Sequence, residues 1–597
     1  MPRRFGRWMA VLVASSVAML APVPVLTPAA EAAEPSAPLQ ATVDAYVARA
    51  QTVTWEPCEG LLFQPRSSCA TVVVPRDWKN PAAGTLRLAV SYLRASGTSK
   101  GLLTSNPGGP GAEGLLFTEA LSRSKPKLYQ DYDLLGFDPR GFGASTNIND
   151  GLPQHRGRCL TTNTKLERLP KVADRRVRNR ATHSMEVAEA KLFGEACAAD
   201  PLARYLNTQQ TVWDVDFLRQ LMAKRYNKGA LYNQLNYIGY SYGTWLGAWY
   251  ADTFPARVGK FVLDSNMQWT TSMYANQALD SKSFQRRRDK MFFPYVARHH
   301  RDFGLGKSTS KVKKKYESIR KSLAKQAAKD LKKGRTATFG PEDLDFVLSS
   351  LLYSNELFPA AGYITELAGD YAKKPSSSKY RKALAKRVKA PMTKAPFVVQ
   401  RSASKVKGSA LVSVDLAGTI VRCNDSATPG NLTQLLKRAD ADARKYPFTG
   451  YLNTIPLCAY WKFKPQTRTI DLTGLSTKML MFQSEGDPAT AYEGALAAHR
   501  RTAGKTVMVS VDNEGQHGLY VDGPSKCLED IGDAFLFRGW KPTADRRCTT
   551  SPLPDDKKVY TLSGPVSGAR SDAKKTIKAK NPTVKAVRAD VAKRGLS

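Results

Sequence analysis

One five-residue motif constrains this chain of 597 residues more than any other feature. Residues 239–243 read Gly-Tyr-Ser-Tyr-Gly, and they lie between the strand-like run 235–238 and the helix-like run 244–253. A side chain at either glycine would collide with neighbouring backbone in such a strained turn from strand to helix. The turn holds the Ser241 hydroxyl at a helix N-terminus, where the helix dipole favours developing negative charge. The pattern therefore predicts an α/β fold in which Ser241 is a nucleophile.

A second glycine cluster, residues 106–111, lies earlier in the chain and reads Asn-Pro-Gly-Gly-Pro-Gly. Such a loop brings backbone N–H groups close to a substrate oxygen, next to the N–H group that follows the nucleophile. Tyr242 is therefore one expected donor of an oxyanion hole. Because Pro110 has no N–H group, Gly109 is the candidate for the other donor, with Gly108 as the alternative.

A third motif, residues 134–145, is typical of a buried strand that enters a tight and charged turn. Asp138 and Arg140 in this turn are interpreted as structural residues. We expect them to form an internal ion pair that fixes the turn beside the active site.

The three motifs follow one another as Gly-Gly-Pro-Gly, Asp-x-Arg-Gly-x-Gly-x-Ser and Gly-Tyr-Ser-Tyr-Gly-Thr-x-Leu-Gly. Together they resemble the secreted α/β-hydrolase peptidases of the proline iminopeptidase and tripeptidyl aminopeptidase type, from residue 55 to residue 548. The resemblance implies an α/β-hydrolase core, with a mostly parallel and doubly wound sheet, and an inserted, mainly helical cap domain. The family often has Ser, Gly and Pro where this chain has Glu113, Ser265 and Ala491. These departures concern substrate choice more than mechanism.

In this fold the base comes last along the chain, after the nucleophile and the acid. His517 is the expected base, because it lies in a glycine-flanked loop after the strand-like run 506–511. The alternatives are His299, His300 and His499, which lie in helix-like segments.

The expected acid is Asp487, which follows the strand-like run 479–482. It precedes Pro-x-Thr, as the catalytic Asp does in the family that the chain resembles. Glu485 is a close rival in sequence, and Asp264 is a second rival at the end of the strand after the nucleophile. The set Ser241, Asp487 and His517 predicts acyl transfer through a covalent intermediate, with no metal and no organic cofactor.

The N-terminus predicts export. Arg3, Arg4 and Arg7 precede the uncharged run 8–21, which is shorter than the roughly 20 apolar residues of a membrane-spanning helix. Small residues at Ala30 and Ala32 complete a secretory signal peptide over residues 1–32, and residues 33–54 are interpreted as a linker or pro-segment. The protein is therefore expected to be secreted, either extracellular or associated with the cell wall.

The chain has eight cysteines and no C-x-x-C pair, so disulfides are expected in an oxidising compartment. Eight cysteines allow many connectivities, and sequence neighbours give the simplest pairing. That pairing joins Cys58 to Cys69, Cys159 to Cys197, Cys423 to Cys458 and Cys527 to Cys548. The last pair is also implied by the family resemblance.

The formal net charge is +38, from 90 Lys plus Arg against 52 Asp plus Glu. The basic residues gather in 307–335, in 373–389 and in the tail 551–597, which is predicted to be flexible and dispensable for activity. No recognised nucleic-acid motif accompanies this charge, so a nucleic-acid partner is not expected. An anionic cell-wall or membrane surface is the expected partner of the tail, and colloidal solubility is the alternative.

The interval between Ser241 and Asp487 is longer than a hydrolase core requires. A helical cap is therefore predicted over residues 266–469, between core segments 55–265 and 470–550, and it would restrict access to the site. The family resemblance implies an acidic cap group that meets the free amine of the substrate. Glu356 and Glu366 are candidates on composition alone, and the alternative is that both are surface charges.

The leading hypothesis is a secreted serine exopeptidase that releases short peptides from free N-termini, and the family resemblance implies tripeptides. A proline iminopeptidase, an esterase or a lipase on the same scaffold remains an alternative, because esters and amides share acyl transfer to serine. A non-catalytic surface-binding protein with this fold is the alternative of a different class.

Overall fold

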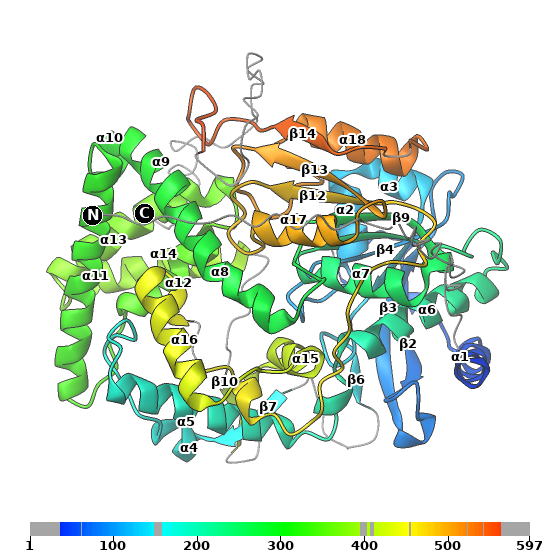
Figure 1. The fold of residues 1–597 in the computed structure, drawn as a ribbon, viewed down its shortest axis with the longest axis horizontal. Coiled ribbons are helices and arrows are strands. Elements are labelled where there is room, and N and C mark those ends of the chain that lie inside the picture. The colour runs from blue at the N-terminus through cyan, green and yellow to red at the C-terminus, as the bar shows by residue number, and fades with distance from the viewer. Residues whose placement is uncertain are drawn as a thin grey trace, which may run out of the picture.

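The structure is a computed structural model that describes residues 36–60, 63–147, 158–394, 403–405, 411–452, 455–521, 523–540 and 543–562. The predicted signal peptide, residues 1–32, lies outside these ranges, and so does the tail from residue 563 on. Figure 1 shows a large sheet with helices against it and a separate group of helices beside it.

The large sheet has eleven strands. In spatial order ten of them are β1 (Glu56–Pro57), β2 (Ser68–Pro75), β3 (Thr85–Leu93), β5 (Asp133–Phe137), β4 (Leu102–Asn106), β8 (Leu235–Tyr240), β9 (Val258–Asp264), β12 (Met479–Ser484), β13 (Thr506–Asp512) and β14 (Arg546–Thr549), while β6 (Thr146–Asn147) pairs with β3. The strands from β5 to β14 pair in parallel, and β1, β2 and β3 pair antiparallel. This mostly parallel sheet confirms the predicted α/β-hydrolase fold class.

Helices cover both faces of this sheet, because its parallel strands are buried on each side. One hydrophobic cluster joins the strands to α1 (Ala37–Ala50), α6 (Thr208–Arg225), α7 (Tyr242–Thr253) and α17 (Tyr492–Arg501). A second cluster joins them to α2 (Phe117–Ser124), α3 (Pro126–Asp131) and α18 (Lys526–Phe537). The carboxyl ends of β4, β8, β9, β12 and β13 therefore meet at one sheet edge, where ligand sites lie in folds of this kind.

Helix α1 lies within residues 33–54, which the sequence interpretation treats as a linker or pro-segment. Val43, Val47 and Ala50 follow one another at helical spacing and are buried. They pack in the same hydrophobic cluster as α6. The described part of this segment therefore belongs to the packed core.

The predicted cap insertion is mainly helical, as Figure 1 shows at the left and centre of the view. Its helices are α8 (Met273–Arg287), α9 (Phe293–Arg298), α10 (His300–Phe303), α11 (Thr309–Lys332), α12 (Pro341–Leu351), α13 (Phe358–Lys373), α14 (Ser378–Lys394), α15 (Ala417–Asp425) and α16 (Leu432–Lys445). Helices α9 and α11 to α14 share a hydrophobic cluster of their own. The lysine-rich run 307–335 contains α11, which buries Ile319 and Leu323 on its inner side.

The cap also contains a second segment that the sequence interpretation assigns to the core. Strand β7 (Arg158–Thr162) pairs with β11 (Leu411–Asp415), which pairs with β10 (Ala403–Lys405) in a separate antiparallel sheet. Helices α4 (Asn163–Glu167) and α5 (Arg180–Ala198) follow β7. Ion pairs then join the loop before α5 to the cap, between Arg176 and Asp345 and between Asp174 and Arg320. The cap is thus assembled from two insertions.

Four disulfides join the cysteines as the expected sequence neighbours. Two of them, Cys159–Cys197 and Cys423–Cys458, lie in the cap segments. Disulfides of this number are typical of exported proteins. Among the described residues, no helix has the length and apolar character that crossing a bilayer requires.

The start of the predicted flexible tail is packed. Leu562 is buried in the hydrophobic cluster of the cap, and Leu553 packs against the same cluster. Asp556 pairs with Arg298 and His299 of the cap. The prediction of a flexible tail is therefore wrong for residues 551–562. Scattered apolar residues pack this segment against the cap, although its high charge favoured a solvated segment.

Candidate active site

The motif around Ser241 forms the predicted strand-to-helix turn. Ser241 follows β8 and caps α7 with φ 56° and ψ −120°, and its N–H donates to the carbonyl of Asp264 at 3.0 Å. A Cβ on Gly243 would lie 2.5 Å from the carbonyl oxygen of Asn106, so glycine is required there. The turn therefore presents Ser241 at the sheet edge described above.

The glycine loop packs directly on this turn. A Cβ on Gly108 would lie 2.9 Å from the Cβ of Ser241 and 3.1 Å from the backbone nitrogen of Tyr242. The N–H of Gly108 donates to the side chain of Asn106 at 2.9 Å, so Gly108 is already engaged. This leaves Gly109 and Tyr242 as the better pair of oxyanion donors.

Asp487 and His517 face each other at the same sheet edge. Nδ1 of His517 lies 3.0 Å from both carboxylate oxygens of Asp487. The N–H groups of Ala489 and Thr490 donate to Asp487 Oδ1 at 2.9 and 2.8 Å, and both Asp487 and His517 are buried. A carboxylate in this position fixes the imidazole tautomer and stabilises the imidazolium form.

The two rival acids accept hydrogen bonds from backbone N–H groups around the His517 loop. Asp264 accepts hydrogen bonds from the N–H groups of Leu519 and Tyr520, and burial raises its pKa to about 7. Glu485 accepts a hydrogen bond from the N–H of Asn513 at 2.8 Å. Both carboxylates therefore anchor the chain around the His517 loop.

Ser265, one of the departures from the family pattern, also supports this loop. Its hydroxyl accepts a hydrogen bond from the N–H of Gly518 at 2.7 Å. A glycine at position 265 could not make this contact. The departure therefore strengthens the loop that follows His517.

Two of the three alternative bases, His299 and His499, pair with other carboxylates. His299 Nε2 lies 3.0 Å from Asp556, and His499 Nε2 lies 2.9 Å from Asp545. Neither histidine therefore pairs with Asp264 at the end of β9 or with Asp487 after β12, as a base at this sheet edge would.

Asp138 and Arg140 are both structural, but they do not form the expected pair. Asp138 accepts hydrogen bonds from the N–H groups of Gly114 and Leu115 at 2.9 Å. Arg140 pairs instead with Asp214 of α6 at 2.6 Å, with both side chains buried. The expected pair of Asp138 with Arg140 is therefore wrong. The carboxylate that Arg140 binds comes from α6, which is distant in sequence, so the local motif does not predict it.

The two candidate cap carboxylates, Glu356 and Glu366, lie on different elements. Glu356 is exposed in the 3-10 helix Asn355–Leu357, three residues after Tyr353, whose carbonyl accepts a hydrogen bond from the N–H of His517. Glu366 lies in α13 beside Gly304 of the cap. Among the contacts of the described residues, none joins either carboxylate to Asp487 or His517. Both are poor candidates for the acidic group that meets the substrate.

Asp280 of α8 is the acidic cap residue that does lie near the site. It interacts electrostatically with Asp487 and Arg422, and burial raises its pKa to about 8. Its Oδ1 is buried and has no hydrogen-bond partner among the described residues. The sequence does not identify it, because only the packing of the cap places α8 over the sheet edge. Gln277 and Phe284 lie on the same face of α8 as Asp280.

A buried polar cluster connects the cap to the His517 loop. The buried Arg287 of α8 donates to Asn355 Oδ1 at 2.7 Å, and Asn355 donates to Glu514 Oε1 at 2.8 Å. Glu514 also accepts a hydrogen bond from the N–H of Gln516 at 2.6 Å. The ring of Tyr353 also packs against the imidazole of His517, with 5.2 Å between the two ring centroids.

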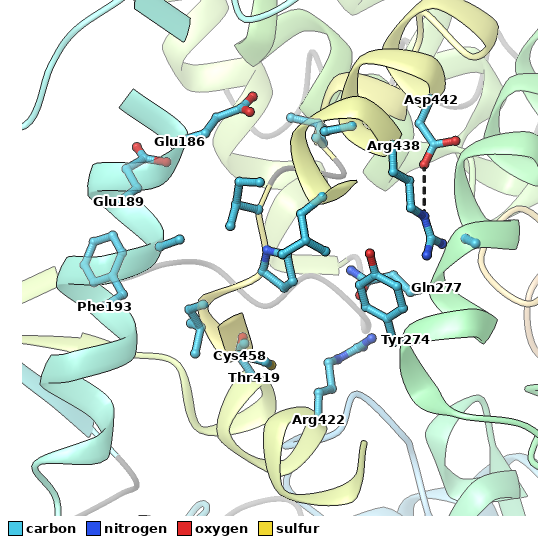
Figure 2. A pocket seen from close by; sticks show the side chains of 18 of the residues that line it. Glu186, Glu189, Phe193, Tyr274, Gln277, Thr419, Arg422, Arg438, Asp442 and Cys458 are labelled. Atoms are coloured by element: carbon cyan, nitrogen blue, oxygen red, sulfur yellow. Dashed lines mark ion pairs between the residues drawn. The ribbon is translucent and has the colours of Figure 1, made fainter. Parts of the chain in front are cut away.

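A cavity of about 200 Å³ lies among the cap segments, and Arg422 on its wall donates a hydrogen bond to the carbonyl oxygen of Gly109. Figure 2 shows Glu186, Glu189 and Phe193 of α5 on one side and Tyr274 and Gln277 of α8 on the other. Helices α15 and α16, Leu416 and residues 452–458 supply the remaining walls. Among the described residues, no group of three or more potential metal ligands occurs.

Comparison with known proteins agrees with this architecture. A family model described as TAP-like protein matches residues 445–548. A tripeptidyl aminopeptidase from Streptomyces coelicolor is 29% identical over 522 residues, which cover 84% of this chain and 87% of that protein. The chain has the α/β-hydrolase fold and is similar to the tripeptidyl aminopeptidases over most of its length. The resemblance predicted from the sequence is confirmed.

A second sequence relative is also named as a protease. The serine protease Hip1 of Mycobacterium tuberculosis is 25% identical over 534 residues, which cover 83% of this chain and 91% of that protein. Among solved structures, the α/β hydrolase GrgF from Penicillium sp. sh18 covers 79% of this chain and 96% of its own at 11% identity, with a TM-score of 0.30. The sequence relatives confirm the prediction of an enzyme.

Proposed function

We propose that this chain is a secreted serine exopeptidase that releases short peptides, with tripeptides as the favoured product, from free N-termini. The observation that carries the proposal is the contact of His517 Nδ1 with both carboxylate oxygens of Asp487, at the sheet edge where the turn presents Ser241. The names of the relatives, tripeptidyl aminopeptidase and serine protease, support the substrate class.

In the proposed reaction, His517 accepts the proton of the Ser241 hydroxyl while the serine oxygen attacks the scissile carbonyl carbon. The peptide N–H groups of Tyr242 and Gly109 donate to the resulting oxyanion, and each such donor contributes about 3–4 kcal/mol. His517 then returns the proton to the leaving amine as the C–N bond breaks. Water attacks the acyl-enzyme in the same way and releases the short N-terminal peptide.

The cap supports an exopeptidase over an endopeptidase. Phe284 of α8 packs on Tyr353, and Tyr353 packs on His517, so these cap residues would act as a roof that restricts the entry of a long peptide chain. Asp280 places a carboxyl group in this roof. An ionised Asp280 would attract a free α-amine, which is a cation below a pKa of about 8.

The test compares one tripeptide amide with a free N-terminus against the same compound acetylated at its N-terminus. We expect acetylation to reduce kcat/KM strongly, because it removes the positive charge. Mono- and dipeptide amides and short-chain esters complete the panel, with the Ser241→Ala variant as the inactive control. An unchanged rate on the acetylated compound contradicts the aminopeptidase assignment, and faster ester hydrolysis favours an esterase.

We also propose export and a role for the positive charge at the protein surface. The four disulfides and the N-terminal sequence support export. Anionic cell-wall polymers or membranes are the proposed partners of residues 563–597. Equal binding of the full chain and of a chain ending at Leu562 to an anionic polymer at low salt would contradict that role.

A further inference from the structure

Arg422 of α15 stands where the cap cavity meets the glycine loop. It lines the cavity, and its Nη2 donates to the carbonyl oxygen of Gly109 at 2.9 Å. Gly109 is one of the two candidate oxyanion donors. A side chain that touches both places is well situated to contact substrate beside the scissile bond. Figure 2 shows Arg422 on the wall that α15 contributes, facing Tyr274 and Gln277.

The residues after Arg422 fix it in this place. Cys423 forms a disulfide with Cys458, and Asn424 donates to the carbonyls of Ala203 and Leu206. Asp425 accepts a hydrogen bond from the N–H of Thr208 at 2.9 Å.

The opposite end of α15 also packs tightly, because a Cβ on Gly418 would overlap the carbonyl oxygen of Pro110. The Thr208 hydroxyl that contacts Asp425 also lies 2.6 Å from the Tyr242 hydroxyl. Helix α15 is therefore tied to the glycine loop and to the helix that follows Ser241, which pre-organises the Arg422 guanidinium.

The charge of Arg422 is not neutralised by a neighbouring carboxylate. Among the described residues, none places a carboxylate oxygen within 4 Å of its guanidinium, whereas Arg438 in the same cavity pairs with Asp442 at 3.9 Å. The cavity carboxylates Glu186 and Glu189 are paired with Arg178 and Arg175.

Asp280 in the roof interacts electrostatically with Arg422, but among the described residues the two form no ion pair. A guanidinium carries five N–H donors, and the contact with Gly109 uses one of them. The remaining donors form a flat edge that fits a carboxylate.

We propose that Arg422 binds a carboxylate of the peptide substrate next to the scissile bond. The enzyme would then prefer substrates that carry a carboxylate at that position. The inference rests on the proposed peptidase function. The carboxylate has two sources, the C-terminus of a leaving residue or an acidic side chain that flanks the cleaved bond. A cavity of about 200 Å³ suits a group of one or two residues, since pockets for drug-sized ligands begin at roughly 300 Å³.

The experiment measures kcat/KM on matched peptides. A tetrapeptide with a free C-terminal carboxylate is compared with its C-terminal amide, and a longer amidated peptide with Glu on either side of the scissile bond is compared with its Gln counterpart. We expect one pair to show a preference of about 10- to 100-fold for the carboxylate, the range for one charge-assisted hydrogen-bonded contact. The pair that shows it identifies the source.

The variants separate recognition from a role in holding the glycine loop. Arg422→Gln is expected to lose the preference while it keeps measurable hydrolysis of the uncharged peptides, and Arg422→Lys is expected to retain part of it. Arg438→Gln, at another wall of the same cavity, is the matched control and is expected to keep the preference.

Two results would overturn the inference. One is a wild-type enzyme that cleaves peptides with no carboxylate preference in either pair, which leaves the proposed function intact. The other is an Arg422→Gln variant that slows carboxylate and neutral peptides by the same factor, which assigns Arg422 to the loop alone. A wild-type enzyme that cleaves none of the peptides overturns the proposed function and this inference with it.

Discussion

Residues 551–562 connect the cap to the loops that carry Asp487 and His517, so the position of a C-terminal truncation matters. The N–H of Leu562 donates to the side chain of Asn513 at 2.7 Å, four residues before His517. A Cβ on Gly486, directly before Asp487, would lie 3.1 Å from the Leu562 side chain. We expect a chain that ends at Leu562 to behave as the full chain, whereas a chain that ends at Ser551 loosens both loops.

The size of the effect follows from the contacts that are lost. Burial of the Leu562 side chain is worth about 2 kcal/mol. The pairs of Asp556 with Arg298 and His299 are partly exposed, so they add about 1 kcal/mol together. A loss of about 3 kcal/mol raises the local opening equilibrium more than 100-fold.

Hydrogen exchange measures this opening directly. In the chain that ends at Ser551 we expect the amides of residues 513–518 to exchange about 100-fold faster, with the amides of β8 unchanged as the internal control. The variant Leu562→Ala in the full chain is expected to show most of the same effect. Equal exchange at 513–518 in the two truncated chains would refute the reasoning and restore the view that the whole tail is dispensable.

Three further outcomes are expected. Asp487→Asn should lower kcat by about 10⁴-fold without a change in fold, measured by kinetics and circular dichroism, because the wrong imidazole tautomer then faces Ser241. Asp214→Asn should lower the free energy of unfolding by about 3–5 kcal/mol in denaturant titrations, because Arg140 is left buried without its partner. The free-amine preference should rise with pH between 6 and 8, because Asp280, with a pKa of about 8, must lose its proton before it attracts an ammonium group. The ratio of kcat/KM for the free and the acetylated substrate tests this, and a ratio that keeps its slope in Asp280→Asn contradicts the assignment.

The sequence predicts the parts of the site that depend on local backbone geometry. Gly239 and Gly243 are needed wherever this turn occurs, so the placement of Ser241 follows from five residues. The strands before Asp487 and His517 are apolar runs followed by polar loops, and the structure brings both side chains to the same edge because parallel strands align their carboxyl ends. Local patterns and a known chain order were sufficient here.

The parts that the sequence does not predict depend on how the insertions pack. Asp280 and Arg422 lie in helices whose polar residues give no sign of which face meets the sheet. Composition favours Glu356 and Glu366 equally, yet among the described contacts neither carboxylate meets Asp487 or His517. The segment 158–198 has no length anomaly comparable to the interval between Ser241 and Asp487, so its place in the cap had no signature in sequence.

The core and the cap contribute different groups to the proposed site. The proposed mechanism requires the core to hold Ser241, Asp487 and His517 rigidly. Backbone N–H groups of Ala489 and Thr490 fix Asp487, and those of Leu519 and Tyr520 fix the loop after His517 on the buried Asp264. The cap supplies the charges instead, a carboxyl group at Asp280 and a guanidinium at Arg422, each on a helix that contacts a different side of the site. Because both charges come from inserted segments, substitutions in the cap can change which peptide ends are accepted while the groups that break the bond stay in place.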